Sequence, residues 1–170
     1  MQNIIKNRQV ISDDWQLLRL NPEGELPQFD PALPVIVPLA SWLADVERWR
    51  RLPGPRALWL APEDDPALLL PYLDEIALIA VDFPSFTDGR GYSIGRLLRE
   101  RYRYLHELRA LGDVWQDQLQ ALWQVGFDSF EIKPGKPLEQ SITALESFSD
   151  HYQGNYRQPD PWFRRSINSV

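Results

Sequence analysis

One segment of the sequence combines the residue types that bind small anions. The segment 86–96 places Gly89 and Gly91 on either side of Arg90, between a predicted strand and a predicted helix. Backbone N–H groups at the start of a helix, brought together by glycine turns, can form an anion pocket. An arginine beside them can add paired hydrogen bonds to an oxyanion. The candidate ligand-binding residues are Thr87, Asp88, Gly89, Arg90, Gly91, Tyr92, Ser93 and Arg96.

The glycine spacing of this loop matches neither the P-loop nor the dinucleotide-binding fingerprint, because it reads GxGxxxG. We expect Ser93 to be the N-cap of the following helix and Gly95 to pack closely against the sheet or a ligand. A simpler alternative is an ordered loop in which the glycines form tight turns and Arg90 pairs with Asp88 or Asp82. A third alternative is a contact with a protein partner.

Two aspartates follow or end predicted strands and form the candidate catalytic pair, Asp82 and Asp113. The carboxyl ends of parallel strands meet at one edge of a sheet, where ligands bind. Such a pair could hold a magnesium ion, or act as a base and its orienting partner. The alternative is that each aspartate caps the next helix or orders its loop. Other polar residues at strand ends are Glu63, Asp64, Asp65, Glu131 and Lys133, and Gly112 precedes Asp113.

Five strand–helix units are expected to position these residues. The predicted strands cover 35–37, 57–61, 76–83, 108–111 and 127–132, and the predicted helices cover 40–51, 66–74, 93–104, 114–125 and 137–149. This alternation predicts an α/β fold with a parallel sheet covered by helices. The sheet is either an open three-layer sheet, which we prefer, or half-barrel-like, because an eight-stranded barrel needs about 250 residues.

Composition divides the chain into three parts. Residues 1–34 form an N-terminal β-hairpin followed by a proline-rich connector, and residues 35–150 form the α/β domain. Residues 151–170 lose the helical periodicity but keep several aromatic side chains. We expect this tail to pack on the domain, because disordered tails are poor in aromatic residues.

The composition also argues against several classes of protein. A net charge of −6 argues against nucleic acid or a membrane surface as partner. Without cysteine there is no disulfide and no cysteine-held metal, so we expect no metal site and leave any cofactor unknown. No apolar run predicts a signal peptide or a membrane span, so we expect a cytoplasmic protein. Six arginines within 90–109 follow seven acids within 61–88. This indicates either solvated faces of opposite charge or a basic surface that docks an acidic partner or gathers a small anion.

Three runs, IALIAVDFPSFTDGRGYSIGRLLRERY, ELRALGDVWQDQL and GFDSFEI, resemble the bacterial domain-of-unknown-function family 934. Its members are commonly labelled probable oxidoreductases of sulfite reduction, and their genes tend to lie beside that of the sulfite or nitrite reductase haemoprotein. The resemblance implies an accessory protein of assimilatory sulfite reduction, with the sulfite reductase haemoprotein or its electron donor as partner. It supplies no catalytic residues.

Two other functions remain open from the sequence. One is an enzyme or sensor that binds a sulfur oxyanion or a phosphate-containing metabolite at 87–96. The other is a cofactor-dependent oxidoreductase, for which a bound flavin or nicotinamide would have to carry the electrons. The sequence also leaves a homodimer open.

Overall fold

The strands of the protein form one curled sheet, seen in a computed structural model that describes residues 2–133, 138–146 and 156–157. The strands are β1 (Gln2–Lys6), β2 (Gln9–Asp13), β3 (Gln16–Leu17), β4 (Val35–Pro38), β5 (Arg56–Leu60), β6 (Ile76–Phe83), β7 (Glu107–Gly112) and β8 (Ser129–Phe130). Their order in the sheet is β2-β1-β8-β7-β6-β5-β4-β3. Strands β3 to β8 run parallel to one another, whereas β1 is antiparallel to both β2 and β8.

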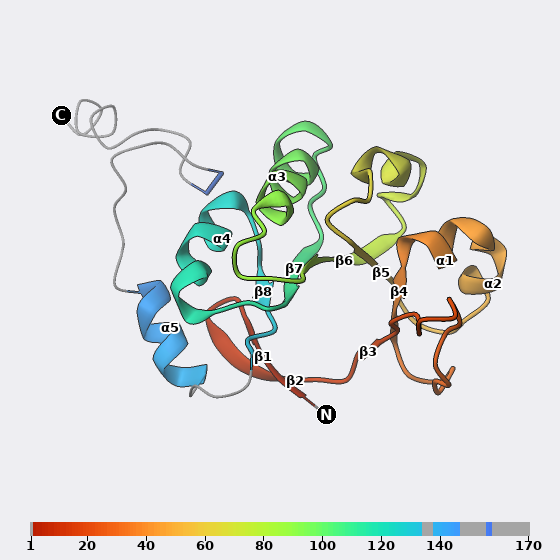
Figure 1. Cartoon of the computed structure of the whole chain (residues 1–170), viewed down its shortest axis with the longest axis horizontal. Helices are drawn as coiled ribbons and strands as arrows, with labels where there is room; N and C mark the ends of the chain where they lie inside the picture. Colours follow the sequence, from red (N-terminus) through yellow and green to blue (C-terminus); the bar gives the residue numbers. More distant parts are fainter. Residues whose placement is uncertain (1, 134–137, 147–155, 158–170) are drawn as a thin grey trace.

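Short helices surround the curled sheet (Figure 1). They are α1 (Leu39–Ala44), α2 (Val46–Arg50), α3 (Arg90–Arg96), α4 (Leu119–Val125) and α5 (Leu138–Glu146), with 3-10 helices η1 (Pro66–Tyr72) and η3 (Gln116–Gln118) and a π-helical turn η2 (Leu97–Arg101). The N-terminal strands, drawn in red, cross the lower side of the molecule in this view, opposite α3 (Figure 1). Within the described ranges, no helix has the length and apolarity needed to cross a membrane.

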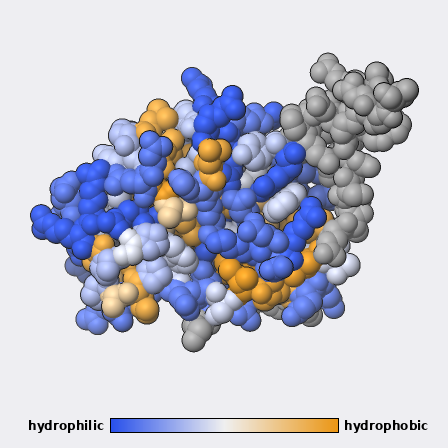
Figure 2. Space-filling view, turned by 180° about the vertical axis from the view of Figure 1, so that it is seen from behind, coloured by the Kyte–Doolittle hydropathy of each residue, from blue (hydrophilic) through white to orange (hydrophobic). Residues whose placement is uncertain are grey.

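The central strand β6 is buried on both faces, which explains its near-continuous apolar sequence. Ile79 and Val81 belong to the large core beneath the helices. Leu78 and Ala80 alternate with them and join a smaller core on the concave face. The reverse side of the molecule is mostly hydrophilic, with separate hydrophobic groups (Figure 2).

The α/β class and the N-terminal hairpin predicted from the sequence are confirmed, and the sheet has the half-barrel-like form rather than the open three-layer form. The hairpin turns at Asn7 and Arg8, which adopt positive φ angles of 49° and 63°. Two such residues in succession match the right-handed twist of the paired strands.

Strand β3 was not predicted, and it changes how the sheet ends. Only Asp14 and Trp15 separate β2 from β3, yet these two strands lie at opposite ends of the strand order. The single segment 9–17 therefore pairs with β1 at its beginning and with β4 at its end. This segment links the two edges of the curled sheet.

The predicted helices are present, but several are shorter or less regular. The helix predicted over 40–51 is broken at Asp45, whose carboxylate accepts a hydrogen bond from the Arg48 N–H at 3.0 Å and starts α2. Pro71 lies inside the 3-10 helix η1, where an α-helix was expected. The predicted strand 127–132 shortens to β8.

Parts of two expectations lie outside the described residues. The helix predicted over 137–149 is observed as α5, while residues 137 and 147–149 are not described. Of the predicted tail 151–170, only Tyr156 and Arg157 are described, and Arg157 donates to Asp128 at 2.8 Å.

Candidate functional site

The predicted site residues lie at the carboxyl ends of β6 and β7. These strands pair in register to their ends, where Phe83 lies opposite Gly112. The Asp113 N–H then donates to the carbonyl of Phe83 at 2.6 Å. The structure thus brings Asp82 and Asp113 to the same edge of the sheet.

Asp82 is bound to an arginine from the N-terminal segment. Asp82 is buried, with 7% of the residue exposed. Its carboxylate accepts two hydrogen bonds from Arg19, at 2.7 and 3.3 Å. The guanidinium of Arg19 in turn lies 5.1 Å from the centre of the Trp59 ring. The Trp59 indole N–H donates to the Leu18 carbonyl at 2.8 Å. Asp82 therefore anchors the segment that follows β3.

Asp113 orders the neighbouring loop. Its carboxylate accepts hydrogen bonds from Lys133 at 2.8 Å, from the Trp115 indole at 2.8 Å and from the Phe86 N–H at 3.1 Å. The bond from Lys133 is the main reason why the pKa of Asp113 lies below its ordinary value. Asp113 is thus an ionised group that holds a loop and a lysine in place.

Neither aspartate stands as the N-cap of a helix, and each has its own cationic partner. Among the residues that the structure describes, no three His, Cys, Asp or Glu side chains gather closely enough to hold a metal ion. Each carboxylate is paired with a cation, Asp82 with Arg19 and Asp113 with Lys133. The arrangement stabilises the edge of the sheet rather than leaving a free carboxylate.

Arg90 pairs with its neighbour in the loop. It donates to the two oxygens of Asp88 at 2.6 and 3.0 Å, while its own backbone N–H donates to the same carboxylate at 3.1 Å. The hydrogen bond from Arg90 is also the main cause that lowers the pKa of Asp88. The Thr87 hydroxyl is 2.9 Å from that of Ser85. This is the ordered-loop arrangement that the sequence offered as an alternative to an anion pocket.

The glycines of this region allow α3 to approach aromatic rings. A Cβ atom on Gly91 would lie 2.5 Å from the Phe83 ring, and one on Gly95 would lie 2.5 Å from the Phe127 ring. Gly89, by contrast, has no atom within 4 Å of such a Cβ. Close packing against the sheet therefore accounts for two of the three glycines.

Three further candidates, Tyr92, Ser93 and Arg96, lie within α3. The expectation that Ser93 caps this helix is wrong, because α3 begins at Arg90 and Ser93 lies exposed inside it. Tyr92 packs edge-on against Phe83, with ring centres 5.5 Å apart. Arg96 pairs with Glu100 one turn later at 3.0 Å.

Two aromatic side chains project from this edge, and the sequence did not single them out. Phe86 is 50% exposed and Trp115 is 38% exposed, and their rings meet edge-on with centres 6.2 Å apart. The Lys133 ammonium lies 5.4 Å from the Trp115 ring. We call Phe86, Trp115 and Lys133 the aromatic edge. Its sequence signal is an aromatic residue three positions beyond the end of each of two neighbouring strands.

A second charged cluster lies on the concave face of the sheet. Arg109 is 1% exposed and donates to Asp13 at 2.8 and 3.1 Å and to Glu107 at 2.9 Å. Glu107 also accepts hydrogen bonds from Lys6 and Ser129, each at 2.6 Å. Burial tends to raise the pKa of Glu107, but the charge of Arg109 and these hydrogen bonds outweigh it and lower that pKa.

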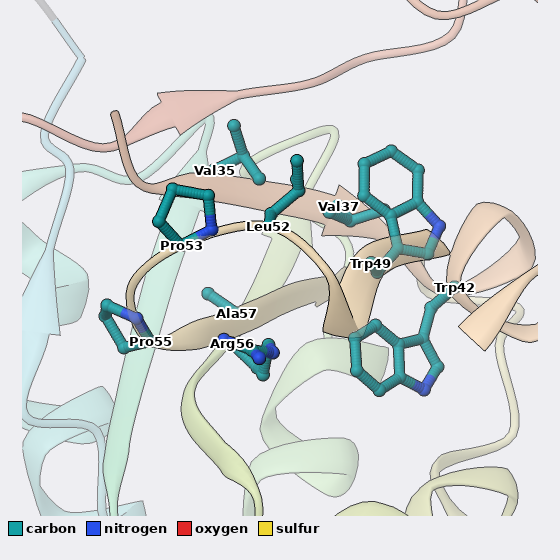
Figure 3. A pocket seen from close by; sticks show the side chains of 9 residues that line it. All are labelled: Val35, Val37, Trp42, Trp49, Leu52, Pro53, Pro55, Arg56 and Ala57. Atoms are coloured by element: carbon teal, nitrogen blue, oxygen red, sulfur yellow. The ribbon is translucent and has the colours of Figure 1, made fainter. Parts of the chain in front are cut away.

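An apolar cavity beneath α1 and α2 is too small to be a ligand site. It lies between β4, β5 and the two helices and is lined by Trp42 and Trp49 among others (Figure 3). Its volume of about 10 Å³ is no more than a single water molecule needs. Both tryptophans are buried, as expected for core residues.

The protein is an α/β protein with a curled, mainly parallel sheet. At the carboxyl ends of its strands, the exposed pair Phe86–Trp115 lies near the ion pairs Asp88–Arg90 and Asp113–Lys133. The family model described as "Bacterial protein of unknown function (DUF934)" matches residues 57–163. This is more than half of the chain, so the protein belongs to that family, as the resemblance predicted. A comparison with curated proteins finds no match.

Proposed function

We propose that this protein is an accessory protein of assimilatory sulfite reduction, which binds the sulfite reductase haemoprotein or its electron donor. The exposed pair Phe86–Trp115 is the observation that carries the binding role. Large aromatic side chains are enriched at the centres of protein interfaces and supply much of their binding energy. The family resemblance supports the pathway.

The surroundings of the pair suit a binding surface. The pair Asp88–Arg90 lies on the loop that carries Phe86, and Asp113, on the loop that carries Trp115, pairs with Lys133 beyond β8. The side chains of Lys133 and Arg90 are 53% and 60% exposed. An apolar centre with a polar, solvated rim is the usual anatomy of a protein interface.

The geometry favours binding a protein over binding a small anion at 87–96. The anion hypothesis requires Arg90 and the start of α3 to face a ligand, but Arg90 is held by Asp88. Gly91 and Gly95 lie against phenylalanine rings rather than beside an open pocket. The same loop does, however, present Phe86 to solvent.

Binding of the purified protein to its two candidate partners tests this proposal. We expect association with either the reductase haemoprotein or its electron donor, measured for each partner separately by calorimetry. Phe86→Ser is expected to weaken that association by about tenfold or more, since central interface aromatics contribute about 2 kcal/mol or more. Leu105→Ser is the matched control, because Leu105 is 79% exposed and lies away from the aromatic edge in the sequence.

The proposal fails if the protein binds neither partner. The role of the aromatic edge fails if Phe86→Ser, shown by circular dichroism to be folded, binds as tightly as Leu105→Ser. These two outcomes separate the function from the surface that performs it.

A further inference from the structure

A hollow at the opposite end of the sheet lies outside the candidate site. It has a volume of about 360 Å³, within the range of small-molecule pockets. Pro34 and Pro55, which precede the parallel strands β4 and β5, place it at their amino ends. Its lining also includes Lys6, Asp13, Asp14, Trp15, Pro53 and Arg109.

The charged wall of the hollow is held in place by buried ion pairs. The Arg109 side chain is 2% exposed and is fixed by Asp13 and Glu107. Lys6 is fixed by Glu107 at 2.6 Å but keeps a side chain that is 36% exposed. Held in this way, Lys6 is a preorganised cation at the surface of the hollow.

Two groups on this wall have spare bonding capacity. The Lys6 ammonium has three N–H donors, of which one bonds to Glu107 within the described part of the chain. Asp14 is exposed, and its carboxylate has no hydrogen bond or ion pair to any described residue. Trp15, Pro34 and Pro53 add an apolar wall beside them.

We propose that this hollow binds a small zwitterion, an α-amino acid. The ligand carboxylate bonds to Lys6, the ammonium bonds to Asp14, and the ligand side chain packs against Trp15 and the prolines. A simple anion would face Asp13 and Asp14, and a simple cation would face Lys6 and Arg109. A zwitterion pairs with the Lys6 cation and the Asp14 anion at once.

Calorimetric titration of the full chain with each common protein L-amino acid tests the proposal. We expect at least one to bind, and its C-terminal amide and its N-acetyl derivative to bind about tenfold more weakly or not at all, because each loses a charged hydrogen bond. Asp14→Asn is expected to weaken binding by a similar factor. Glu23→Gln is the charge-matched control, since Glu23 is exposed and does not line the hollow.

Three results would overturn the proposal: no amino acid binds, the blocked derivatives bind as tightly as the free amino acid, or Asp14→Asn binds like Glu23→Gln. Asp14 is exposed and has no described partner, so the Asn variant is expected to fold. Lys6→Gln is a second test variant. It is expected to reduce the difference in affinity between the free amino acid and its C-terminal amide. None of these results depends on reductase binding.

Discussion

At the residue scale, the two buried glycines of α3 are fixed by the rings beneath them. Alanine at position 91 would place its methyl group 2.5 Å from the Phe83 ring. Alanine at position 95 would place its methyl group 2.5 Å from the Phe127 ring. We expect each of Gly91→Ala and Gly95→Ala to lower the free energy of unfolding by about 1–3 kcal/mol through overpacking. Most of this range exceeds the roughly 1 kcal/mol that alanine contributes to a helix relative to glycine. Urea denaturation measures the change.

Gly89→Ala is the control for these two substitutions. Gly89 has a φ of −84° and open space around the added methyl group, so alanine is compatible with its backbone. We expect a gain of about 0.4–1 kcal/mol, because alanine reduces the entropy of the unfolded chain. If all three variants behaved alike, the packing explanation of the glycine pattern would be wrong.

The buried carboxylate of Glu107 makes stability depend on pH. Its pKa is lowered in the folded protein, so the folded state binds fewer protons than the unfolded state. The stability it contributes is complete above the ordinary glutamate pKa of about 4.3 and is lost as the pH falls through the lowered value.

Comparison with Glu107→Gln measures this contribution. We expect the advantage of the natural protein in free energy of unfolding to be largest near neutral pH and to shrink on acidification below about pH 4.3. An advantage that stayed constant from neutral pH to pH 3 would contradict the lowered pKa.

The positions of single residues could be predicted from the sequence where the order of parallel strands determines them. It placed Asp82 and Asp113 at one edge because parallel strands end together. It could not identify their partners, because Arg19 lies 63 positions from Asp82. The pair Asp13–Arg109 spans 96 positions, so the run of arginines gave no sign that this one is buried.

At the element scale, the N-terminal segment 9–17 is joined to both edges of the sheet, and Arg109 of β7 binds Asp13 at the end of β2. Removing Arg109 would leave Asp13 without a cation among the described residues, and Glu107 with Lys6 as its remaining cationic partner, both in a largely buried place. We therefore expect Arg109→Met to lower the free energy of unfolding by about 3–5 kcal/mol. Urea denaturation followed by circular dichroism measures this loss.

Arg90→Met is the matched control for this substitution. The Arg90 side chain is 60% exposed and pairs with Asp88 at the surface. Exposed ion pairs contribute little to stability, so we expect almost no change. An equal effect of the two substitutions would show that the Arg109 cluster does not anchor the segment.

The elements themselves were predictable to different degrees. The strand 76–83 was predicted with its observed bounds, because a strand buried on both faces has an unmistakable apolar sequence. The helices were predicted too long where one side chain interrupts the periodicity, as Asp45 does between α1 and α2. Strand β3 has two residues, which is too short for an alternating pattern. It is defined by its hydrogen bonds to β4, which lies far along the chain, so no local pattern could predict it.

At the scale of the whole molecule, the uneven charge of the sequence does not become one basic surface. Arg99 and Arg109 are buried in ion pairs with Asp128 and Asp13, while Arg90 and Arg96 pair with neighbouring acids at the surface. The aromatic edge, rather than a field of positive charge, is the feature that distinguishes the proposed binding face.

The most direct test of the proposed function is growth of a deletion strain on sulfate, sulfite, sulfide or cysteine as the sole sulfur source. We predict failure on sulfate and sulfite and normal growth on sulfide and cysteine, because these bypass sulfite reduction. The natural protein and Leu105→Ser should restore growth, whereas Phe86→Ser should not. Normal growth of the deletion strain on all four sources would contradict the proposed function, and full restoration by Phe86→Ser would contradict the role of the aromatic edge.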